Sequence, residues 1–301
     1  MKKLFLLLII VLLLVGCSSS TDVTLPLSYD TGIDPNSWAL IPAGEFLYGQ
    51  FDEETMVDYD YQMMVTEVTN QQYADYLNEA LTAGYITLDV EKNEIVGYYP
   101  GDEFHGYEHE EEIIAGDWVH IPLDGEGLKL VYENGLFTVI PGYENHPMVS
   151  VSWFGAKAYC EYYSWVLPTE VEWEKAARGT NGLPYPWGDD IESGNANFYS
   201  SRDLAEEVNG RQGDTTSVGF YNGMSYDGFQ TIDSPSPYGI YDIVGNVEEW
   251  TNDVYENQHY RYLRGGSMMF MGYDLRVWVW NNSGPYYSSQ SIGFRCISVS
   301  D

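Results

Sequence analysis

Residues 238–255 read YGIYDIVGNVEEWTNDVY, a stretch that combines glycines, which permit tight turns, with Trp250, a large packing group. The same combination recurs upstream in LPTEVEWEKAARG (residues 167–179) and YPWGDD (residues 185–190). The chain has 30 Gly and 13 Pro, so we expect many turns and short elements rather than long helices. We interpret the tryptophans of these and similar motifs as packing groups of one fold: Trp153, Trp173, Trp187 and Trp250.

Three stretches carry helix signals. The first runs from Asn70, a candidate N-cap, to Gly84, with apolar residues at helical spacing between them. The second covers residues 152–163 and gathers alanine, tyrosine and cysteine on one face. The third begins with a capping box of Thr169 and Glu172, and a glycine ends it.

Strand signals lie before and after these helices. WALIPAGEFLY (residues 38–48) alternates around a Pro-Ala-Gly turn and predicts an opening hairpin. Residues from about 85 to 145 predict a β-rich region with hairpins at Asp124-Gly125 and Asn134-Gly135. Near the end of the chain we expect three further strands, at residues 262–267, 275–280 and 293–299.

The charge of the chain restricts its partners. Of 301 residues, 46 are Asp or Glu and 13 are Lys or Arg, which gives a formal net charge of -33. Nucleic acid is excluded as a partner because a polyanion needs a basic surface, and surface docking on anionic headgroups is disfavoured for the same reason. Aromatic residues make up 16% of the chain, far more than a disordered chain carries, so we expect a folded core.

The N-terminus has the layout of a targeting signal. Residues 1–16 read MKKLFLLLIIVLLLVG, two lysines before an apolar run that is shorter than the ~20 residues of a membrane span. The ending LVG-Cys17 resembles the bacterial lipobox, whose cysteine is acylated. We therefore expect lipidation at Cys17, a flexible tether over residues 17–37, and a membrane-anchored place in the bacterial cell envelope, facing the periplasm or the exterior. An ordinary cleaved signal or a single anchor helix is the alternative.

A series of motifs stands in the order found in the formylglycine-generating enzyme (sulfatase-modifying factor) family, which the chain resembles. The resemblance implies one domain over residues 38–300, interrupted by the β-rich insertion at about 85–145. The implied fold is α+β, related to C-type lectins, with little regular secondary structure. The motifs are WALIPAGEFLYG, VTEVTNQQYADYLN, HPMVSVSWFGAKAYCEYY, LPTEVEWEKAARG, YPWGDD, YGIYDIVGNVEEWTNDVY, RYLRGGS and IGFRC.

The resemblance fails at the family's catalytic centre. Family enzymes oxidise a sulfatase cysteine to formylglycine, using two cysteines after a GGS motif that bind copper(I) through soft thiolates. Here an ungapped alignment from that motif places Phe270 and Leu275 at those positions, and no cysteine lies between Cys160 and Cys296. Because neither side chain replaces a thiolate, we expect no formylglycine formation of this type and no copper.

Apart from Cys17 the chain has an even pair of cysteines, and composition alone leaves a disulfide and two buried thiols equally open. The resemblance favours the disulfide, because Cys160 in AYC and Cys296 in GFRC match two family cysteines that pair.

The resemblance also implies calcium, which takes six to eight oxygen ligands. The loop from Asp242 to Trp250 matches a family calcium loop, and a second site would begin at Asn197-Phe198, with Asn209 and Asp214 as candidate partners. In the first loop the expected ligands are Asp242 and Glu249 through carboxylates and Gly245 and Val247 through carbonyls.

Three further groups of residues resemble ligand or binding sites. Met268, Met269 and Met271 are interpreted as gap-filling hydrophobic residues rather than thioether copper ligands. Residues 105–111 contain H-x3-H-x-E, a non-haem iron pattern, but the surrounding glycines favour a solvated acidic hairpin. Near the lost cysteines we expect a pocket that stacks on a sugar or peptide, with Ser267, Arg276, Trp278 and Tyr286 as its candidate lining.

These observations favour a lipid-anchored, non-catalytic family member that acts as a ligand-, glycan- or protein-binding module or as a structural one. The alternative is a divergent oxidoreductase of the formylglycine-generating or non-haem-iron type that modifies a protein or small-molecule thiol.

Overall fold

The computed structural model describes residues 28–102, 113–206, 213–255 and 259–299. The chain forms a mixed α+β fold in which a few helices are set among many short strands. Within the described ranges the α-helices are α1 (Asn70–Ala83), α2 (Trp153–Tyr162) and α3 (Glu170–Arg178). None of them is long and apolar enough to span a bilayer.

The helices begin and end where local side chains satisfy their backbone groups. The predicted capping box of α3 is confirmed, with Thr169 and Glu172 each bonding the backbone of the other. For α1 the cap is Thr69 rather than Asn70, because Thr69 forms a capping box with Gln72. The amide of Asn70 is instead buried and donates to backbone carbonyls of the segment before α2.

Two sheets form the middle of the molecule. The first has the order β1-β4-β16, and the second has the order β14-β13-β12-β15, with β12 and β15 parallel. Their strands are β1 (Trp38–Ile41), β4 (Tyr61–Met64), β16 (Ile297–Val299), β12 (Glu248–Val254), β13 (Arg261–Arg264), β14 (Trp280–Ser283) and β15 (Ile292–Gly293).

The predicted opening hairpin is wrong. β1 pairs with β4, whereas β2 (Gly44–Tyr48) pairs with β3 (Glu53–Val57) in a separate hairpin. The turn between β1 and β2 is held by Asp60, whose carboxylate accepts the N–H of Ala43 at 2.7 Å. The alternation of apolar and polar residues identified β1 and β2 as strands. It could not identify the partner of β1, because β4 lies farther along the chain than the next strand.

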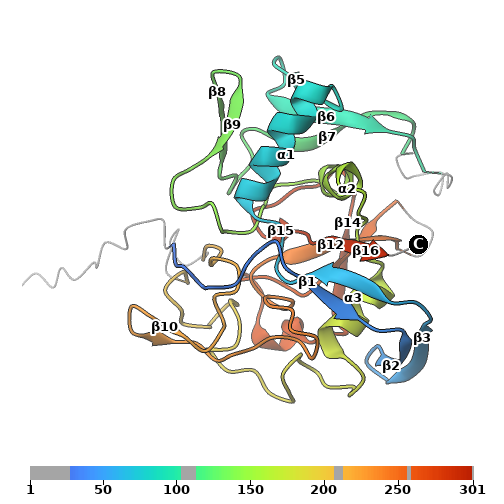
Figure 1. Cartoon of the computed structure of the whole chain (residues 1–301), viewed down its shortest axis with the longest axis vertical. Coiled ribbons are helices and arrows are strands. Elements are labelled where there is room, and N and C mark those ends of the chain that lie inside the picture. Colours follow the sequence, from blue (N-terminus) through green and yellow to red (C-terminus); the bar gives the residue numbers. More distant parts are fainter. Residues whose placement is uncertain (1–27, 103–112, 207–212, 256–258, 300–301) are drawn as a thin grey trace, which may run out of the picture.

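The β-rich region is confirmed. β5 (Ile86–Asp89), β6 (Glu94–Tyr99) and β7 (Gly116–Pro122) form one sheet, and β8 (Leu130–Glu133) pairs with β9 (Leu136–Val139). The turn at Asn134-Gly135 has positive φ at both residues, as a two-residue hairpin requires. The hairpin predicted at Asp124-Gly125 is wrong, because β7 and β8 belong to different sheets. In Figure 1 these strands lie beside α1, and α3 lies with β1 and β2 on the opposite side.

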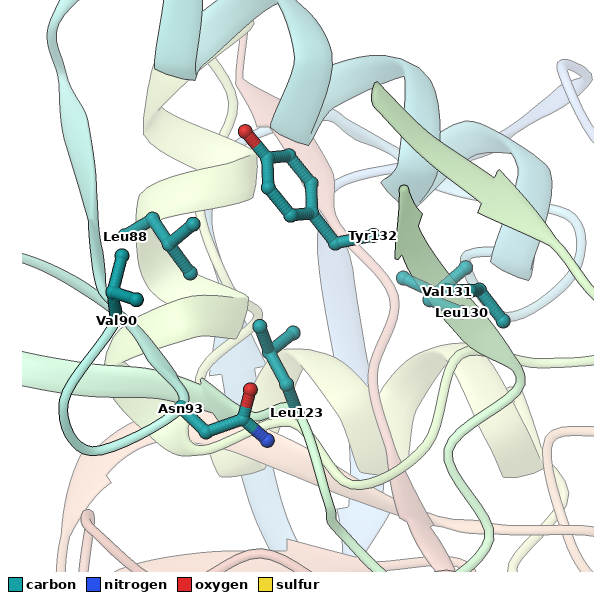
Figure 2. A pocket seen from close by; sticks show the side chains of 7 residues that line it. All are labelled: Leu88, Val90, Asn93, Leu123, Leu130, Val131 and Tyr132. Atoms are coloured by element: carbon teal, nitrogen blue, oxygen red, sulfur yellow. The ribbon is translucent and has the colours of Figure 1, made fainter. Parts of the chain in front are cut away.

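A cavity of about 490 Å³ separates the two sheets of this region. Figure 2 shows side chains from both sheets facing a common space, with Tyr132 above Leu123. The lining is apolar apart from one amide and one phenol, and it carries no carboxylate or imidazole: Leu88, Val90, Asn93, Leu123, Leu130, Val131 and Tyr132.

The strand predicted at residues 275–280 is wrong. Residues Gly272–Leu275 form a 3₁₀ turn, η2, and β14 begins only at Trp280. The backbone of Val277 bonds to Pro184 and to the guanidinium of Arg264, so no neighbouring strand pairs with it. Two strands that the sequence pattern did not reveal, β10 (Ser225–Tyr226) and β11 (Phe229–Gln230), form a small hairpin.

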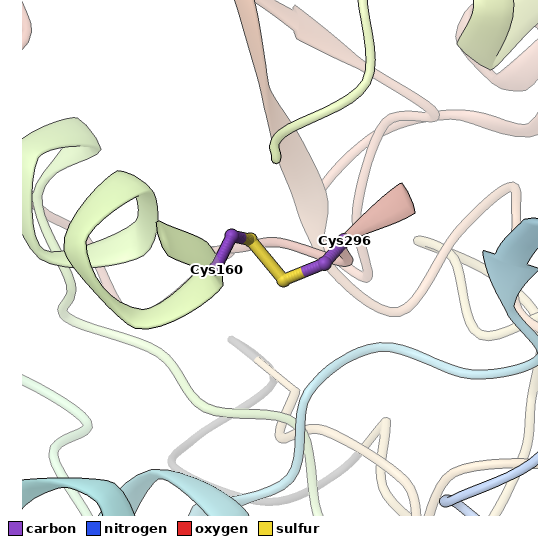
Figure 3. The surroundings of a disulfide bond; sticks show 2 residues. All are labelled: Cys160 and Cys296. Carbon is purple, nitrogen blue, oxygen red and sulfur yellow. A yellow bond between two sulfur atoms is a disulfide. The ribbon is translucent and has the colours of Figure 1, made fainter. Parts of the chain in front are cut away.

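The core consists of two main clusters, one on α1 and α2 and the other around Trp173 of α3. Trp153, Trp173 and Trp250 are fully buried, as predicted for packing groups, and Trp187 packs half-buried on the second cluster. A disulfide joins Cys160 of α2 to Cys296, just before β16, with Cα atoms 5.7 Å apart (Figure 3). The pairing implied by the family resemblance is confirmed.

Part of the predicted tether belongs to the folded domain. The ring of Tyr29 lies 5.0 Å from that of Tyr226 and 5.5 Å from that of Phe220. The hydroxyl of Thr31 donates to the carbonyl of Val218 at 2.9 Å. Residues 28–37 therefore pack on the domain, while Cys17 and the signal lie outside the described residues.

Candidate functional site

A cleft of about 260 Å³ opens beside the segment that follows Gly265-Gly266-Ser267. Such a volume lies just below the ~300–1,000 Å³ of typical ligand sites and admits one small group. Carboxylates and an amide face apolar and aromatic walls, contributed by β12, β13, β14 and the loop containing η2. The lining residues are Glu248, Leu263, Gly266, Phe270, Asp274, Val279, Trp280 and Asn281.

The two positions aligned with the family cysteines have different surroundings. Phe270 is half-buried and forms part of the cleft wall. Leu275 is fully buried beneath the cleft, against Gly266 and Gly245. A Cβ on Gly266 would lie 3.0 Å from Cδ1 of Leu275, and both glycines have positive φ, so this close packing requires glycine.

Glu248 is the titratable group deepest in the cleft. It starts β12, where its N–H donates to the carbonyl of Ser291 at 2.8 Å and its residue is 5% exposed. Burial raises the pKa of Glu248 to about 7, while a hydrogen bond with the side chain of Asn281 acts in the opposite direction. At neutral pH this carboxyl group therefore exists in both protonation states.

We predict that Glu248 makes the free energy of unfolding depend on pH. Its pKa is higher in the folded chain, so its stabilising contribution is complete below about pH 4.5 and is lost as the pH rises through about 7. Glu248→Gln should remove this component and flatten the profile by on the order of 2–3 kcal/mol. Urea unfolding followed by tryptophan fluorescence across this pH range measures it. The exposed Glu91→Gln variant is the control, and parallel profiles for wild type and Glu248→Gln would contradict the prediction.

Trp280 provides an aromatic surface at the cleft. Its side chain is 44% exposed, and its ring lies 5.1 Å from that of Tyr255 and 5.5 Å from that of Tyr262. These two rings support the indole: Tyr262 lies on β13, which pairs with β14, and Tyr255 directly follows β12. The cleft thus places a supported, partly exposed ring beside Glu248 and Asn281.

The predicted pocket residues do not line this cleft. Ser267 is fully buried, and its hydroxyl accepts the N–H of Met269. Arg276 donates to the carbonyl of Tyr273 and stacks on the rings of Tyr273 and Trp278. Tyr286 is half exposed beside Gly284. The cleft lies beside the GGS motif, where the pocket was expected, but its lining does not include Ser267, Arg276, Trp278 or Tyr286.

The sequence contained a signal for one missed residue. Glu248 and Glu249 are adjacent on a strand whose side chains alternate between faces, so at least one carboxylate of the pair points inward. In the structure both are buried, with Glu248 facing the cleft and Glu249 in the core.

The first predicted calcium loop has its carboxylates already engaged. Both oxygens of Glu249 accept hydrogen bonds from Arg295, and one also accepts the indole N–H of Trp173 at 2.9 Å. Asp242 accepts the N–H of Gly219 at 2.5 Å, and burial raises its pKa to about 6. The expected donor set also includes the carbonyls of Gly245 and Val247. It does not suit Ca²⁺, because the guanidinium of Arg295 already binds the Glu249 carboxylate that would face the ion.

The second predicted loop is also internally bonded. The carbonyl of Asn197 accepts the N–H of Asn246, and its amide donates to the carbonyl of Asp214. The Asp214 carboxylate pairs with Lys129 at 3.2 Å and accepts the hydroxyl of Tyr143. The ring of Phe198 packs in the second core cluster. Asn209 lies outside the described residues. At both loops a cation of the protein itself neutralises the carboxylate.

The remaining candidates contribute no further site. Met268 is buried, as expected for a gap-filling residue, but Met269 and Met271 are 42% and 52% exposed. The H-x3-H-x-E pattern at residues 105–111 lies outside the described residues. Within the described ranges no group of three or more His, Cys, Asp or Glu side chains is placed to hold a metal ion.

Residues 30–299 match the family described as the sulfatase-modifying factor enzyme 1-like domain, and the chain belongs to this family. The mouse formylglycine-generating enzyme is 29% identical over 289 residues, which cover 85% of this chain and 73% of that protein. The bovine inactive C-alpha-formylglycine-generating enzyme 2 is 36% identical over 160 residues, half of each chain.

A third relative is a serine/threonine-protein kinase pkn1 of Chlamydia pneumoniae, 36% identical over 187 residues. The match covers 56% of this chain but 26% of the relative, so the chain spans about a quarter of the length of the first curated relatives that it matches.

Solved structures confirm the predicted fold. PvdO from Pseudomonas aeruginosa superposes with a TM-score of 0.54 at 20% identity, over 87% of this chain and 94% of that one. CarF superposes with a TM-score of 0.50 at 21% identity, over 88% of this chain and 98% of that one. The chain therefore has the C-type-lectin-like α+β fold that the resemblance implied.

Proposed function

We propose that this chain is a non-catalytic member of the sulfatase-modifying factor family and that its cleft at Phe270 binds a sugar unit of a glycan. We further propose that acylation of Cys17 anchors the domain to the cell envelope on its extracytoplasmic side. The mass of the N-terminal peptide, measured on protein from membranes, tests the anchor, because an unmodified Cys17 would reject it.

The residues at the two positions aligned with the family cysteines support the non-catalytic assignment. Position 270 is a phenylalanine, position 275 is a leucine packed under Gly266, and no cysteine lies between Cys160 and Cys296. Those two cysteines are joined in a disulfide, so neither offers a thiolate. We therefore infer that copper(I) chemistry of the family type does not occur here. A relative whose name describes it as inactive supports the idea that the fold persists without the reaction.

The chemistry of the cleft supports a sugar as ligand. Trp280 presents a partly exposed ring on which the C–H face of a sugar stacks, and Asn281 and Glu248 supply hydrogen-bonding groups for its hydroxyls. The small volume fits one unit, and the exposed rim leaves room for the rest of a chain. The protonated form of Glu248 donates a hydrogen bond and the ionised form accepts one.

The alternative remains a divergent oxidoreductase acting on a thiol. Glu248 favours it, because a buried carboxyl group with a pKa of about 7 can accept a proton from a substrate near neutral pH. Such a reaction also needs a redox centre, and the described residues gather no set of metal-ligating side chains.

We predict that Trp280→Ala weakens binding to glycans selected on an array by roughly tenfold or more, which corresponds to about 1.4 kcal/mol of lost stacking. The matched control is Phe51→Ala, because Phe51 is 82% exposed and lies outside the cleft. Titration with copper(I) and oxidation of a sulfatase peptide are measured on the same protein. Tight copper binding or turnover would reject the non-catalytic assignment, and an array without any ligand would reject glycan binding.

A further inference from the structure

A second cavity lies between α1, α2 and the sheet of β6 and β7, on elements that do not contribute to the cleft at Phe270. Its volume of about 560 Å³ is within the range of small-molecule sites. Four tyrosines dominate its lining, together with one imidazole and one carboxylate: Tyr76, Tyr85, Tyr98, Tyr162, His120 and Glu161.

His120 is directed by a β-bulge. Ile95 of β6 pairs with Ile121 and the next residue, Val96, pairs with Val119, so His120 is the extra residue of β7. Its ring fits against Gly97, where an added Cβ would lie 2.5 Å from Cε1 of the imidazole. Any larger residue at position 97 would displace the ring. The backbone of both strands thus makes room for this side chain.

The imidazole of His120 is buried and has unused bonding capacity. The residue is 2% exposed, yet its Nδ1 has no hydrogen-bond partner among the described residues. Burial lowers the pKa of His120 to about 4, so the ring is neutral at pH 7 and one ring nitrogen is an acceptor. An unpaired buried polar group is uncommon, and here it belongs to a ring that also forms part of the cavity wall.

The tyrosines form an aromatic corner. The ring of Tyr162 lies 5.3 Å from that of Tyr76 at 67° and 5.6 Å from that of Tyr85 at 84°. Tyr85 and Tyr98 are 70% and 68% exposed, so their rings are available to a molecule that enters. These edge-to-face rings bound adjacent sides of the cavity, and the face of a tyrosine ring attracts a cation.

Two carboxylates, Glu161 and Glu79, and one ammonium group, Lys157, lie near this corner. The pKa of Tyr76 is raised mainly by burial, then by two neighbouring phenols, and then by the charge of Glu161. The pKa of Tyr162 is raised first by burial and next by the charge of Glu79. Lys157 pairs with Glu161 at 2.8 Å, and that carboxylate is 54% exposed. The net charge of -33 adds a long-range field that concentrates cations at the surface.

We infer that this cavity binds a small organic ammonium ion, held over the tyrosine rings and near the Glu161 carboxylate, with the neutral His120 ring forming part of the cavity wall. A neutral ligand of the same shape would use the rings but would gain nothing from the carboxylates. Charge therefore separates this inference from sugar binding, and the site is independent of the cleft at Phe270.

The test is calorimetric titration of the full chain with choline and with its neutral isostere 3,3-dimethylbutan-1-ol. We expect choline to bind with a Kd on the order of 1 mM or below and the isostere to bind at least about tenfold more weakly. Raising the salt concentration to about 0.5 M should weaken choline binding, because a salt-screened carboxylate contributes to it. Failure of choline to bind, or equal affinity for the isostere, would overturn the inference.

Variants test whether choline binds in this cavity. Tyr85→Leu and Glu161→Gln change exposed side chains and should each weaken choline binding about fivefold or more. Tyr287→Leu is the matched control, because Tyr287 is 50% exposed and lies outside the cavity. Trp280→Ala should leave choline binding unchanged, which separates this site from glycan binding at the cleft. Equal affinity in wild type and Tyr85→Leu would overturn the assignment to this cavity.

Discussion

Arg295→Met should lower the free energy of unfolding by about 3–5 kcal/mol at pH 7, because it leaves buried carboxylates without their cation. Arg295 and Glu249 are both fully buried, and Nη2 of the arginine lies 2.7 Å from Oε1 of the glutamate. Glu67, also fully buried, has an oxygen 4.0 Å from the same guanidinium. Methionine fills much of the volume, so the expected loss reflects charge more than packing.

The guanidinium also satisfies backbone groups. It donates to the carbonyls of Met64, at the end of β4, and of Val65, which follows it. It also donates to the carbonyl of Tyr241, the residue before Asp242. Arg295 thus connects two segments, residues 64–65 and the loop beginning at Tyr241, to the strand that contains Glu249. Its removal leaves these carbonyls short of donors, which adds to the expected loss.

The effect of Arg295→Met should depend on pH in a defined direction. In the wild type, burial already raises the pKa of Asp242 to about 6 and that of Glu67 well above its usual range, and Arg295 opposes both shifts. Without the arginine these pKa values rise further, so the variant takes up protons on folding. Its deficit should therefore be largest above about pH 7 and should shrink as the pH falls towards about 5.

Urea unfolding of both proteins at these two pH values measures the effect. Arg276→Met is the matched control, because Arg276 stacks on partly exposed rings and is expected to contribute less than about 1 kcal/mol. A deficit in Arg295→Met that is the same at both pH values would show that packing, not charge, is lost.

The features that the sequence predicted are those with local causes. The capping box of Thr169 and Glu172 lies within one helical turn, and the Asn134-Gly135 turn needs only two residues. Strand pairing depends on partners far along the chain, so β1 was recognised as a strand but assigned to the wrong partner. The family motifs supplied the disulfide, which spacing alone left open.

The acidic composition concealed the buried charges. The chain has a net charge of -33, yet four arginines are fully buried: Arg178, Arg261, Arg264 and Arg295. Each has a carboxylate partner within 3.2 Å, for example Arg264 with Glu170 and Glu174. Sequence patterns give no sign of such pairs because both partners are of types that normally lie at the surface.

Removal of the disulfide should have an effect of similar size through a different mechanism. The double variant Cys160→Ala/Cys296→Ala should lose about 4–5 kcal/mol, because the bond closes a loop with a sequence separation of 136 residues. Chain-entropy arguments assign this loss to the greater freedom of the unfolded chain rather than to broken contacts. Because both sulfurs are buried in the α1–α2 core cluster, truncation adds a small packing loss.

Two measurements separate these contributions. Unfolding of the wild type in urea with and without a phosphine reductant compares the cross-linked and open unfolded chains without any change of sequence. The buried Ala156→Gly variant of α2 serves as a control for truncation in the same cluster, with an expected loss of about 1 kcal/mol. The entropic account requires that reduction of the wild type lower the urea midpoint nearly as much as the double variant does. If reduction has little effect while the double variant unfolds readily, the stabilisation comes from packing around the sulfurs instead.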